Sequence, residues 1–172
     1  LNIRREIHKR KFKKYDIAFN LRYHPLLQFV KDFLPRLGQV YSTRIYAGYF
    51  LPYWRKGIDY RQTSSARKEL GGGVHIELTH EIDYILWFFG LPMTVWGYVN
   101  KISSLDISTV DICSALFQYE GGSIVELHLD YLSQKYLRGG QIIAERGTLE
   151  WDLDQKKVWF LEKGKKSSRK VF

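Results

Sequence analysis

The chain has 172 residues, of which 45% are apolar, and a formal net charge of +9. This apolar fraction is too high for an intrinsically disordered chain, and the length suits one domain with a sizeable core. Cys113 is the only cysteine in the sequence, which excludes an internal disulfide and a cysteine-rich zinc module. No apolar run approaches the roughly 20 residues that cross a bilayer, and residues 1–14 lack the apolar core of a secretory signal. We therefore expect a cytoplasmic protein with no membrane partner.

The positive charge is concentrated at the two ends of the chain. Residues 1–14 and residues 156–172 each carry seven basic side chains and one acidic side chain, so the segment between them has a net charge of −3. Basic ends are more often solvated tails or helix faces than recognition surfaces. No zinc-finger spacing or RNA-binding aromatic motif accompanies them. We expect no nucleic-acid partner, and binding of nucleic acid by the basic ends is an alternative hypothesis.

The first 70 residues predict two helices, two strands and a long loop. Residues 2–12 favour a short basic helix, and residues 15–20 alternate as a strand does. Pro25 in a first turn, followed by apolar residues at helical spacing, predicts a helix that is ended by Pro35 and Gly38. Residues 39–49 are rich in β-branched and aromatic side chains and predict a long strand. Residues 50–70 show no period, and a loop of this length is usually functional or disordered.

The second part of the chain is rich in strands. Three glycines, residues 71–73, lead into a predicted helix over residues 74–89. Beyond it, turn signals separate six strand-like segments: residues 94–102, 109–119, 123–132, 137–145, 148–153 and 157–162. Short turns between consecutive strands indicate an antiparallel meander. The predicted fold class is therefore α+β, a two-layer arrangement with helices packed on one face of a large, mostly antiparallel open sheet.

One face of the helix predicted over residues 74–89 is polar. Helical spacing places Glu77, His80, Tyr84 and Trp87 in one band, apart from an apolar stripe. Histidine can move a proton near neutral pH, and a carboxylate one turn away can orient it. The alternative is that Glu77 and His80 solvate the helix surface. A metal half-site of this spacing needs a second such pair, so no metal is expected, and no dinucleotide fingerprint or phosphate-binding loop is found.

Several segments resemble a known family. KELGGGVHIELTHEIDYILWFFG is similar to the hallmark helix of the Gfo/Idh/MocA oxidoreductases, in which a glycine-rich turn precedes an acidic residue and then a histidine. AFNLRYHPLL (18–27), the loop at 49–61 and the EGGSIVELHLDYL hairpin are similar as well. The resemblance covers about residue 14 to residue 160 and concerns only the C-terminal domain of that family.

The resemblance implies one half of a two-domain NAD(P)-dependent oxidoreductase, with a glyceraldehyde-3-phosphate dehydrogenase-like C-terminal fold. In that family a Rossmann domain binds NAD or NADP, and the C-terminal domain supplies the substrate pocket and commonly the oligomer interface. We expect residues 1–14 to be the crossover from the Rossmann domain, residues 15–162 to be the substrate-binding and oligomerisation domain, and residues 163–172 to be a basic tail. The segment with the family's catalytic lysine has no counterpart here, so the chain alone is expected to be inactive.

The resemblance also implies roles for individual residues. His80 matches the catalytic histidine, and Glu77, also expected to be catalytic, stands where the family usually has Asp. Asn20 matches a position near the nicotinamide. Contacts with the substrate are expected from five side chains: Arg22, Trp54, Arg55, Tyr60 and Tyr84. The alternatives are a structural ion pair for Arg22 and a core anchor for Trp54.

The expected substrate is a sugar, a sugar nucleotide or a polyol, with hydride transfer at a carbinol or carbonyl carbon. The alternative is a non-enzymatic binding or assembly module derived from the same family. We also expect a homodimer or homotetramer, because residues 123–132 alternate between an apolar side and a mixed side. One side can pack on the helices, and the other can meet a second subunit.

Overall fold

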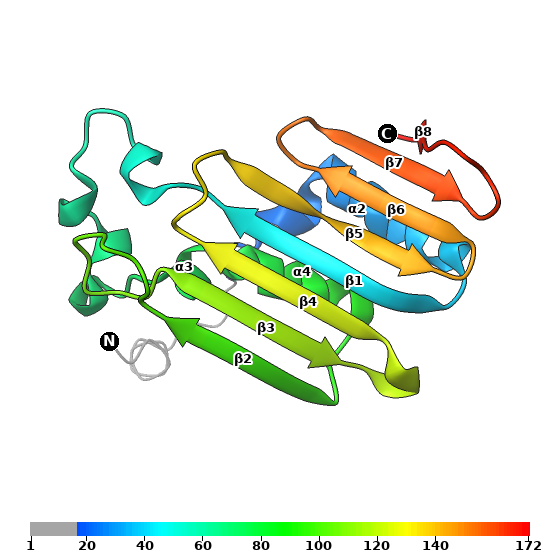
Figure 1. The fold of residues 1–172 in the computed structure, drawn as a ribbon, viewed down its shortest axis with the longest axis horizontal. Coiled ribbons are helices and arrows are strands. Elements are labelled where there is room, and N and C mark those ends of the chain that lie inside the picture. The colour runs from blue at the N-terminus through cyan, green and yellow to red at the C-terminus, as the bar shows by residue number, and fades with distance from the viewer. Residues whose placement is uncertain (1–16) are drawn as a thin grey trace, which may run out of the picture.

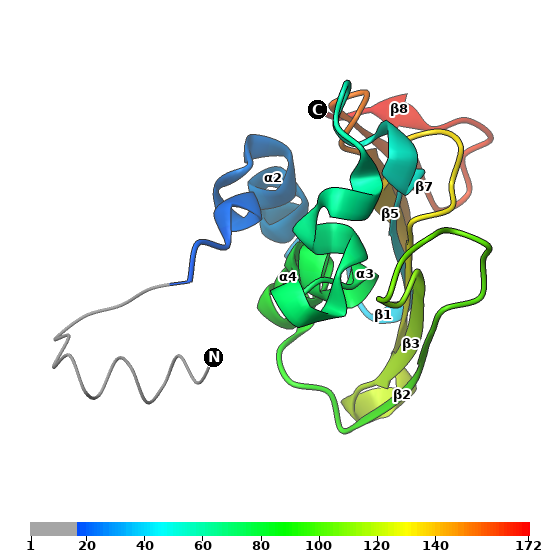
Figure 2. The ribbon, with the colours of Figure 1, turned by 90° about the vertical axis from the view of Figure 1, so that its left-hand side faces the viewer.

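The computed structural model describes residues 17–172, so the helix predicted over residues 2–12 lies outside the described residues. The described chain folds around one eight-stranded sheet, in the order β2-β3-β4-β1-β5-β6-β7-β8. The helices lie against one face of this sheet and leave the other face open (Figure 1, Figure 2). The predicted α+β fold, with helices on one face of a large, mostly antiparallel open sheet, is confirmed.

Every strand predicted between residues 39 and 162 is present. The strands are β1 Val40–Gly48, β2 Thr94–Asn100, β3 Ile112–Gln118, β4 Ile124–Asp130, β5 Leu137–Ala144, β6 Gly147–Asp152, β7 Lys157–Glu162 and β8 Arg169–Lys170. The short β8 was not predicted. It belongs to the segment expected to be a basic tail, which returns to β7 through a 2.9 Å hydrogen bond from the Val171 nitrogen to the Val158 carbonyl.

The prediction of a continuous antiparallel meander is wrong in one place. β4 and β5 follow each other in the chain, but β1 lies between them in the sheet. β1 pairs parallel with β4 and antiparallel with β5, and the other neighbouring strands pair antiparallel. The strand that comes first in the chain therefore occupies the middle of the sheet. Its helix-facing residues Thr43, Ile45 and Ala47 are all buried.

The helix α2 spans Pro25–Phe33, as its apolar spacing predicts. Its N-cap is His24, whose Nδ1 accepts a hydrogen bond of 3.3 Å from the Leu26 nitrogen, and Pro25 occupies the first turn. The prediction of a strand over residues 15–20 is wrong for residues 17–20, the part that the structure describes. Residues 17–19 are irregular, and Asn20–Tyr23 form a 3-10 turn. Among residues 17–172, no helix is both long enough and apolar enough to cross a bilayer.

The helix predicted over residues 74–89 is divided into two. α3 spans Val74–Glu77 and α4 spans Thr79–Phe89, with Leu78 between them at φ −103° and ψ 30°. This break changes the register of the side chains. The buried face of α4 includes Glu81 and Tyr84. The prediction that Tyr84 shares a polar band with Glu77 and His80 along one continuous helix is therefore wrong.

The residues between β1 and α3 form an ordered segment. Four short 3-10 turns follow one another: Leu51–Tyr53, Tyr60–Gln62, Ser64–Ala66 and Lys68–Leu70. The segment extends beyond the carboxyl ends of β1 and β4 and returns to α3 (Figure 1). It therefore lies at the end of the sheet where the glycine turn and α3 begin.

Candidate functional site

A cavity of about 480 Å³ opens at the carboxyl end of β1. Its walls come from the end of β1, the segment after it, the junction of α3 and α4, and the start of β5. Four of the side chains predicted from the sequence line it: Glu77, His80, Trp54 and Arg55. A volume of this order suits a small organic ligand, and the lining combines aromatic surface with a few charged groups, as ligand sites in proteins do.

His80 lies in the first turn of α4. Its ring packs edge-on against Phe19, with the ring centroids 6.0 Å apart. Its Nδ1 is buried without a hydrogen-bond partner among the described residues. Nε2 is therefore the nitrogen through which His80 can exchange a proton with a molecule in the cavity.

Glu77 ends α3 and is held by a residue that the sequence did not indicate. Oε1 of Glu77 accepts a 2.9 Å hydrogen bond from Oγ of Ser65, which is fully buried. No hydrogen bond joins Glu77 to His80 in the described structure. The expected orientation of His80 by this carboxylate is therefore absent, and the two groups have separate neighbours.

Trp54 is both a core anchor and part of the cavity wall. Its Nε1–H donates to the Tyr49 carbonyl over 2.8 Å, and its ring meets Tyr131 edge-on at 5.1 Å between centroids. Burial raises the pKa of Tyr131, so its hydroxyl stays neutral. The indole is thus fixed on one side while another part lines the cavity.

Arg138, at the start of β5, is a cavity residue that sequence reasoning missed. Its guanidinium forms two hydrogen bonds with the fully buried Glu81, at 2.7 and 3.0 Å. Burial by itself lowers the pKa of Arg138, but the hydrogen bonds and charge of Glu81 outweigh it, and the pKa is raised. The pair contributes no net charge to the cavity wall. A contact over 57 residues leaves no local pattern in the sequence.

A family model described as GFO/IDH/MocA C-terminal domain matches residues 35–150. The chain belongs to this family. No curated protein sequence matches the chain. Solved structures do match: levoglucosan dehydrogenase in complex with NADH and L-sorbose has a TM-score of 0.75 and 13% identity over 90% of this chain. An oxidoreductase from Pseudomonas syringae has a TM-score of 0.72 and 16% identity over 99% of the chain.

A third similar structure is the WlbA dehydrogenase from Bordetella pertussis, in complex with NADH and UDP-GlcNAcA. It has a TM-score of 0.61 and 20% identity over 74% of this chain. The GFO/IDH/MocA domain described here spans less than half of these proteins, covering 46% of the first, 44% of the second and 39% of the third. At these identities the comparison shows a shared fold.

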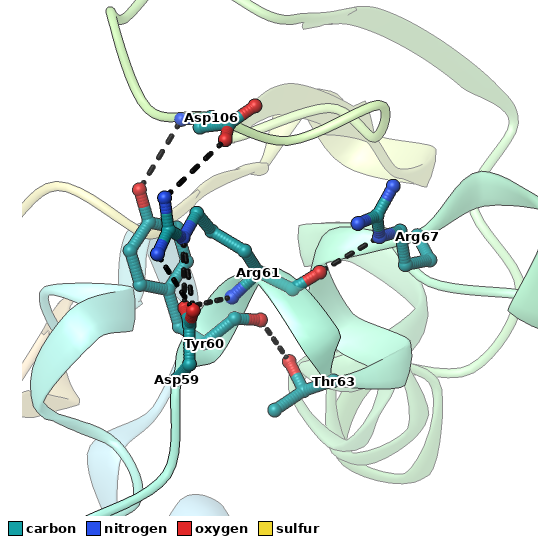
Figure 3. Close-up of polar contacts among 6 residues, drawn as sticks. All are labelled: Asp59, Tyr60, Arg61, Thr63, Arg67 and Asp106. Carbon is teal, nitrogen blue, oxygen red and sulfur yellow. Dashed lines mark hydrogen bonds and ion pairs between the residues drawn. The ribbon is translucent and has the colours of Figure 1, made fainter.

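In this GFO/IDH/MocA domain, two predicted substrate contacts lie away from the cavity. Tyr84 is fully buried, its hydroxyl has no hydrogen-bond partner among the described residues, and burial raises its pKa well above the ordinary value. Tyr60 lies in the loop, where its hydroxyl accepts a 3.3 Å hydrogen bond from the Asp106 nitrogen (Figure 3). The neighbouring Arg61 is bound to Asp59 at 2.7 Å. The geometry brings neither tyrosine to the cavity.

The turn before α2 carries the last two predicted site residues of the GFO/IDH/MocA domain. Arg22 forms two hydrogen bonds with Asp83 of α4, at 2.8 and 2.7 Å, so the structural ion pair is present. Asn20 is exposed at the start of the same turn. Within residues 17–172 there is no group of three or more His, Cys, Asp or Glu side chains that could hold a metal ion.

Proposed function

We propose that this chain is the substrate-binding and oligomerisation domain of an NAD(P)-dependent oxidoreductase acting on a sugar, a sugar nucleotide or a polyol. The observation that carries the proposal is the cavity in which His80 and Glu77 lie beside Trp54 and Arg55 in a member of this family. Similar proteins were solved with NADH and with L-sorbose, levoglucosan or UDP-GlcNAcA, which supports a sugar-like substrate. The cytoplasmic location and the lack of a nucleic-acid partner stay predictions.

The described residues offer a small contact surface for a nicotinamide dinucleotide. The exposed Asn20 amide follows Phe19, and Phe19 contacts the His80 ring, whose Nδ1 is buried without a partner in the described structure. We assign the nicotinamide end of the cofactor to these groups, as the family resemblance implies for Asn20. A bound nicotinamide accepts or supplies the hydride at the substrate carbon.

His80 is the proposed proton-transfer residue. In oxidation of a carbinol, Nε2 takes the hydroxyl proton while the O–H bond breaks and the carbonyl forms. In reduction the same nitrogen returns the proton to the oxygen. The Glu77 carboxylate and the Arg55 guanidinium hold the substrate, and Trp54 excludes water from one side of it.

The decisive experiment uses the complete protein that contains this chain. Turnover of NAD(H) and NADP(H) with a panel of sugars, sugar nucleotides and polyols is followed by the absorbance of the reduced nicotinamide. We expect His80→Ala to lower kcat by a factor of roughly 10²–10⁴. His75→Gln is the matched control, since His75 lies on α3 but does not line the cavity. Full activity in His80→Ala would remove the catalytic assignment.

The alternative, a non-enzymatic module, predicts a different result in the same assay. Such a protein binds a sugar but shows no turnover with either nucleotide. Residues 1–172 alone are expected to be inactive under both hypotheses, so the complete protein is the informative sample.

Assembly through the open face of the sheet is part of the proposal. A second cavity of about 610 Å³ lies on this face, and Arg44, Glu126, Trp96 and Tyr98 contribute to its walls. Trp96 and Tyr98 are 53% and 52% exposed, and Arg44 pairs with Glu126 at 3.2 Å. Exposed aromatic side chains beside charges of both signs suit a self-complementary contact with a second copy.

Light scattering on the complete protein tests this assembly. We expect a dimer or tetramer, and we expect Trp96→Glu to shift it toward the monomer. Ile58→Glu, which changes a 53% exposed residue in the segment after β1, is the control and should leave the mass unchanged. A monomeric wild-type protein would contradict the proposed assembly.

A further inference from the structure

The segment before α3 holds the Glu77 carboxylate from outside the helix. Ser65 is fully buried, and its Oγ donates a hydrogen bond of 2.9 Å to Oε1 of Glu77. Its backbone carbonyl accepts a hydrogen bond of 2.9 Å from Oγ1 of Thr109, which is also buried. Ser65 is therefore fixed at its carbonyl and at its hydroxyl, so the direction in which it donates is fixed as well.

Arg55 extends this arrangement toward the mouth of the cavity. Its Nη1 donates to Oγ of Ser65 over 3.4 Å, so the serine hydroxyl accepts from the arginine and gives its one proton to Glu77. Within the described part of the chain, Arg55 has no carboxylate at ion-pair distance, and Oε2 of Glu77 accepts no hydrogen bond. One carboxylate oxygen and most of the guanidinium N–H groups are thus available to a ligand.

A carboxylate oxygen that can accept a hydrogen bond, beside guanidinium N–H groups that can donate, is complementary to two adjacent hydroxyl groups. One hydroxyl of such a pair can donate to Oε2 of Glu77 while its neighbour accepts from Arg55, and both hydrogen bonds involve a charged partner. Tyr49, Trp54 and Tyr136 line the same cavity and offer apolar surface to the C–H groups of a ring.

We propose that this cavity selects substrates that carry two adjacent hydroxyl groups, with Glu77 and Arg55 as the contacts and Ser65 as the residue that positions Glu77. The inference rests on the proposed function, because it takes the ligand of the cavity to be sugar-like. Ser65 touches no substrate. It acts by keeping Oε1 of Glu77 occupied, so that Oε2 is the carboxylate oxygen left for a ligand in the cavity.

The test measures binding rather than turnover. Saturation-transfer NMR on the complete protein gives the affinities of L-sorbose and levoglucosan, which have adjacent hydroxyls, and of cis-1,4-cyclohexanediol, which does not. We expect Ser65→Ala to weaken binding of the two sugars roughly tenfold, the loss of about one hydrogen bond to a charged group. Ser64→Ala, a change at the exposed neighbour, should leave the affinities unchanged.

A double-variant comparison separates positioning from a general structural effect. If Ser65 acts through Glu77, Ser65→Ala weakens binding in the wild-type background and adds nothing in the Glu77→Gln background. A general structural effect would weaken binding equally in both backgrounds and would overturn the positioning role. Should Ser65→Ala lose its fold, Arg55→Gln, a change of an exposed side chain, tests the same hydroxyl contacts and should also weaken sugar binding roughly tenfold.

The remaining outcomes distinguish this inference from the proposed function. If neither sugar binds the wild-type protein, the proposed sugar-like substrate and this inference both fail. If the sugars bind and Ser65→Ala behaves like Ser64→Ala, only the inference fails. Equal affinity for cis-1,4-cyclohexanediol and the sugars would overturn the selection of adjacent hydroxyls.

Discussion

The buried ion pair between Glu81 and Arg138 gives the sharpest prediction about stability. Glu81 is fully buried, and the Arg138 side chain is 18% exposed, so both charges are largely removed from water. Two hydrogen bonds, of 2.7 and 3.0 Å, compensate the carboxylate. Replacing Arg138 by Met keeps a side chain of comparable length but leaves the carboxylate buried without its partner.

The magnitude follows from the desolvation of that carboxylate. Removal of one partner of a buried pair costs about 3–5 kcal/mol, whereas replacement of both by apolar residues is often close to neutral. We therefore expect Arg138→Met to lose about 3–5 kcal/mol of unfolding free energy, and Glu81→Leu with Arg138→Met to recover most of it. For a domain of this size, the single variant should melt about 6–20 °C lower than the wild type.

Denaturant unfolding of the four proteins of the cycle, as complete chains, measures the coupling energy between the two residues. A double variant as unstable as Arg138→Met, or a coupling energy below about 1 kcal/mol, would refute the reasoning.

Four further variants, one of them a control, can be checked by unfolding the complete protein. In Gly72→Ala the new methyl group would meet the backbone carbonyl of Ser64, so we expect a loss of about 1–3 kcal/mol, whereas Gly97→Ala, with nothing closer than 3.7 Å, should be tolerated. Burial raises the pKa of Asp130, but hydrogen bonds outweigh it and lower the pKa below 3.8. Asp130→Asn should therefore lower the free energy of unfolding above pH 3.8. This loss of stability should disappear as the pH falls through the lowered pKa of Asp130. Lys31→Met removes the ammonium group that donates to two carbonyls at the end of α4, at 2.7 and 3.1 Å, and should lose about 1–2 kcal/mol.

The parts of the fold that depend on local patterns were predictable from the sequence. Apolar spacing and Pro25 place α2 within a residue or two, and runs of β-branched and aromatic residues locate β1 to β7. The position of β1 between β4 and β5 was not predictable, because strand pairing over about a hundred residues depends on which apolar face is most completely buried. The short β8 was not predictable either, because its two residues, Arg169 and Lys170, are basic and such residues are typical of solvated tails.

The same distinction holds for the candidate site. The glycine turn and the helix after it indicated Glu77 and His80, and the resemblance of the loop at 49–61 to the family indicated Trp54. Ser65 and Arg138 could not be identified, because their contacts with α3 and α4 span 12 and 57 residues and leave no periodic signal. Tyr84 was assigned to the polar band on the assumption of one continuous helix, and the break at Leu78 removes that assumption.

The break at Leu78 also gives Glu77 and His80 separate contacts and, we expect, separate roles. On a continuous helix, residues three apart are neighbours and can share a proton or a hydrogen bond. Here Glu77 ends α3 and is bound by Ser65, while His80 begins α4 and packs against Phe19. We therefore expect the two groups to act independently in the complete protein: Glu77→Gln should mainly raise KM, through lost substrate contacts, and His80→Ala should mainly lower kcat. Steady-state kinetics on the two single variants and the double variant check this, with multiplicative effects expected. Strongly non-multiplicative effects, or an equal fall of kcat in both single variants, would show that the two residues act as one unit despite the break.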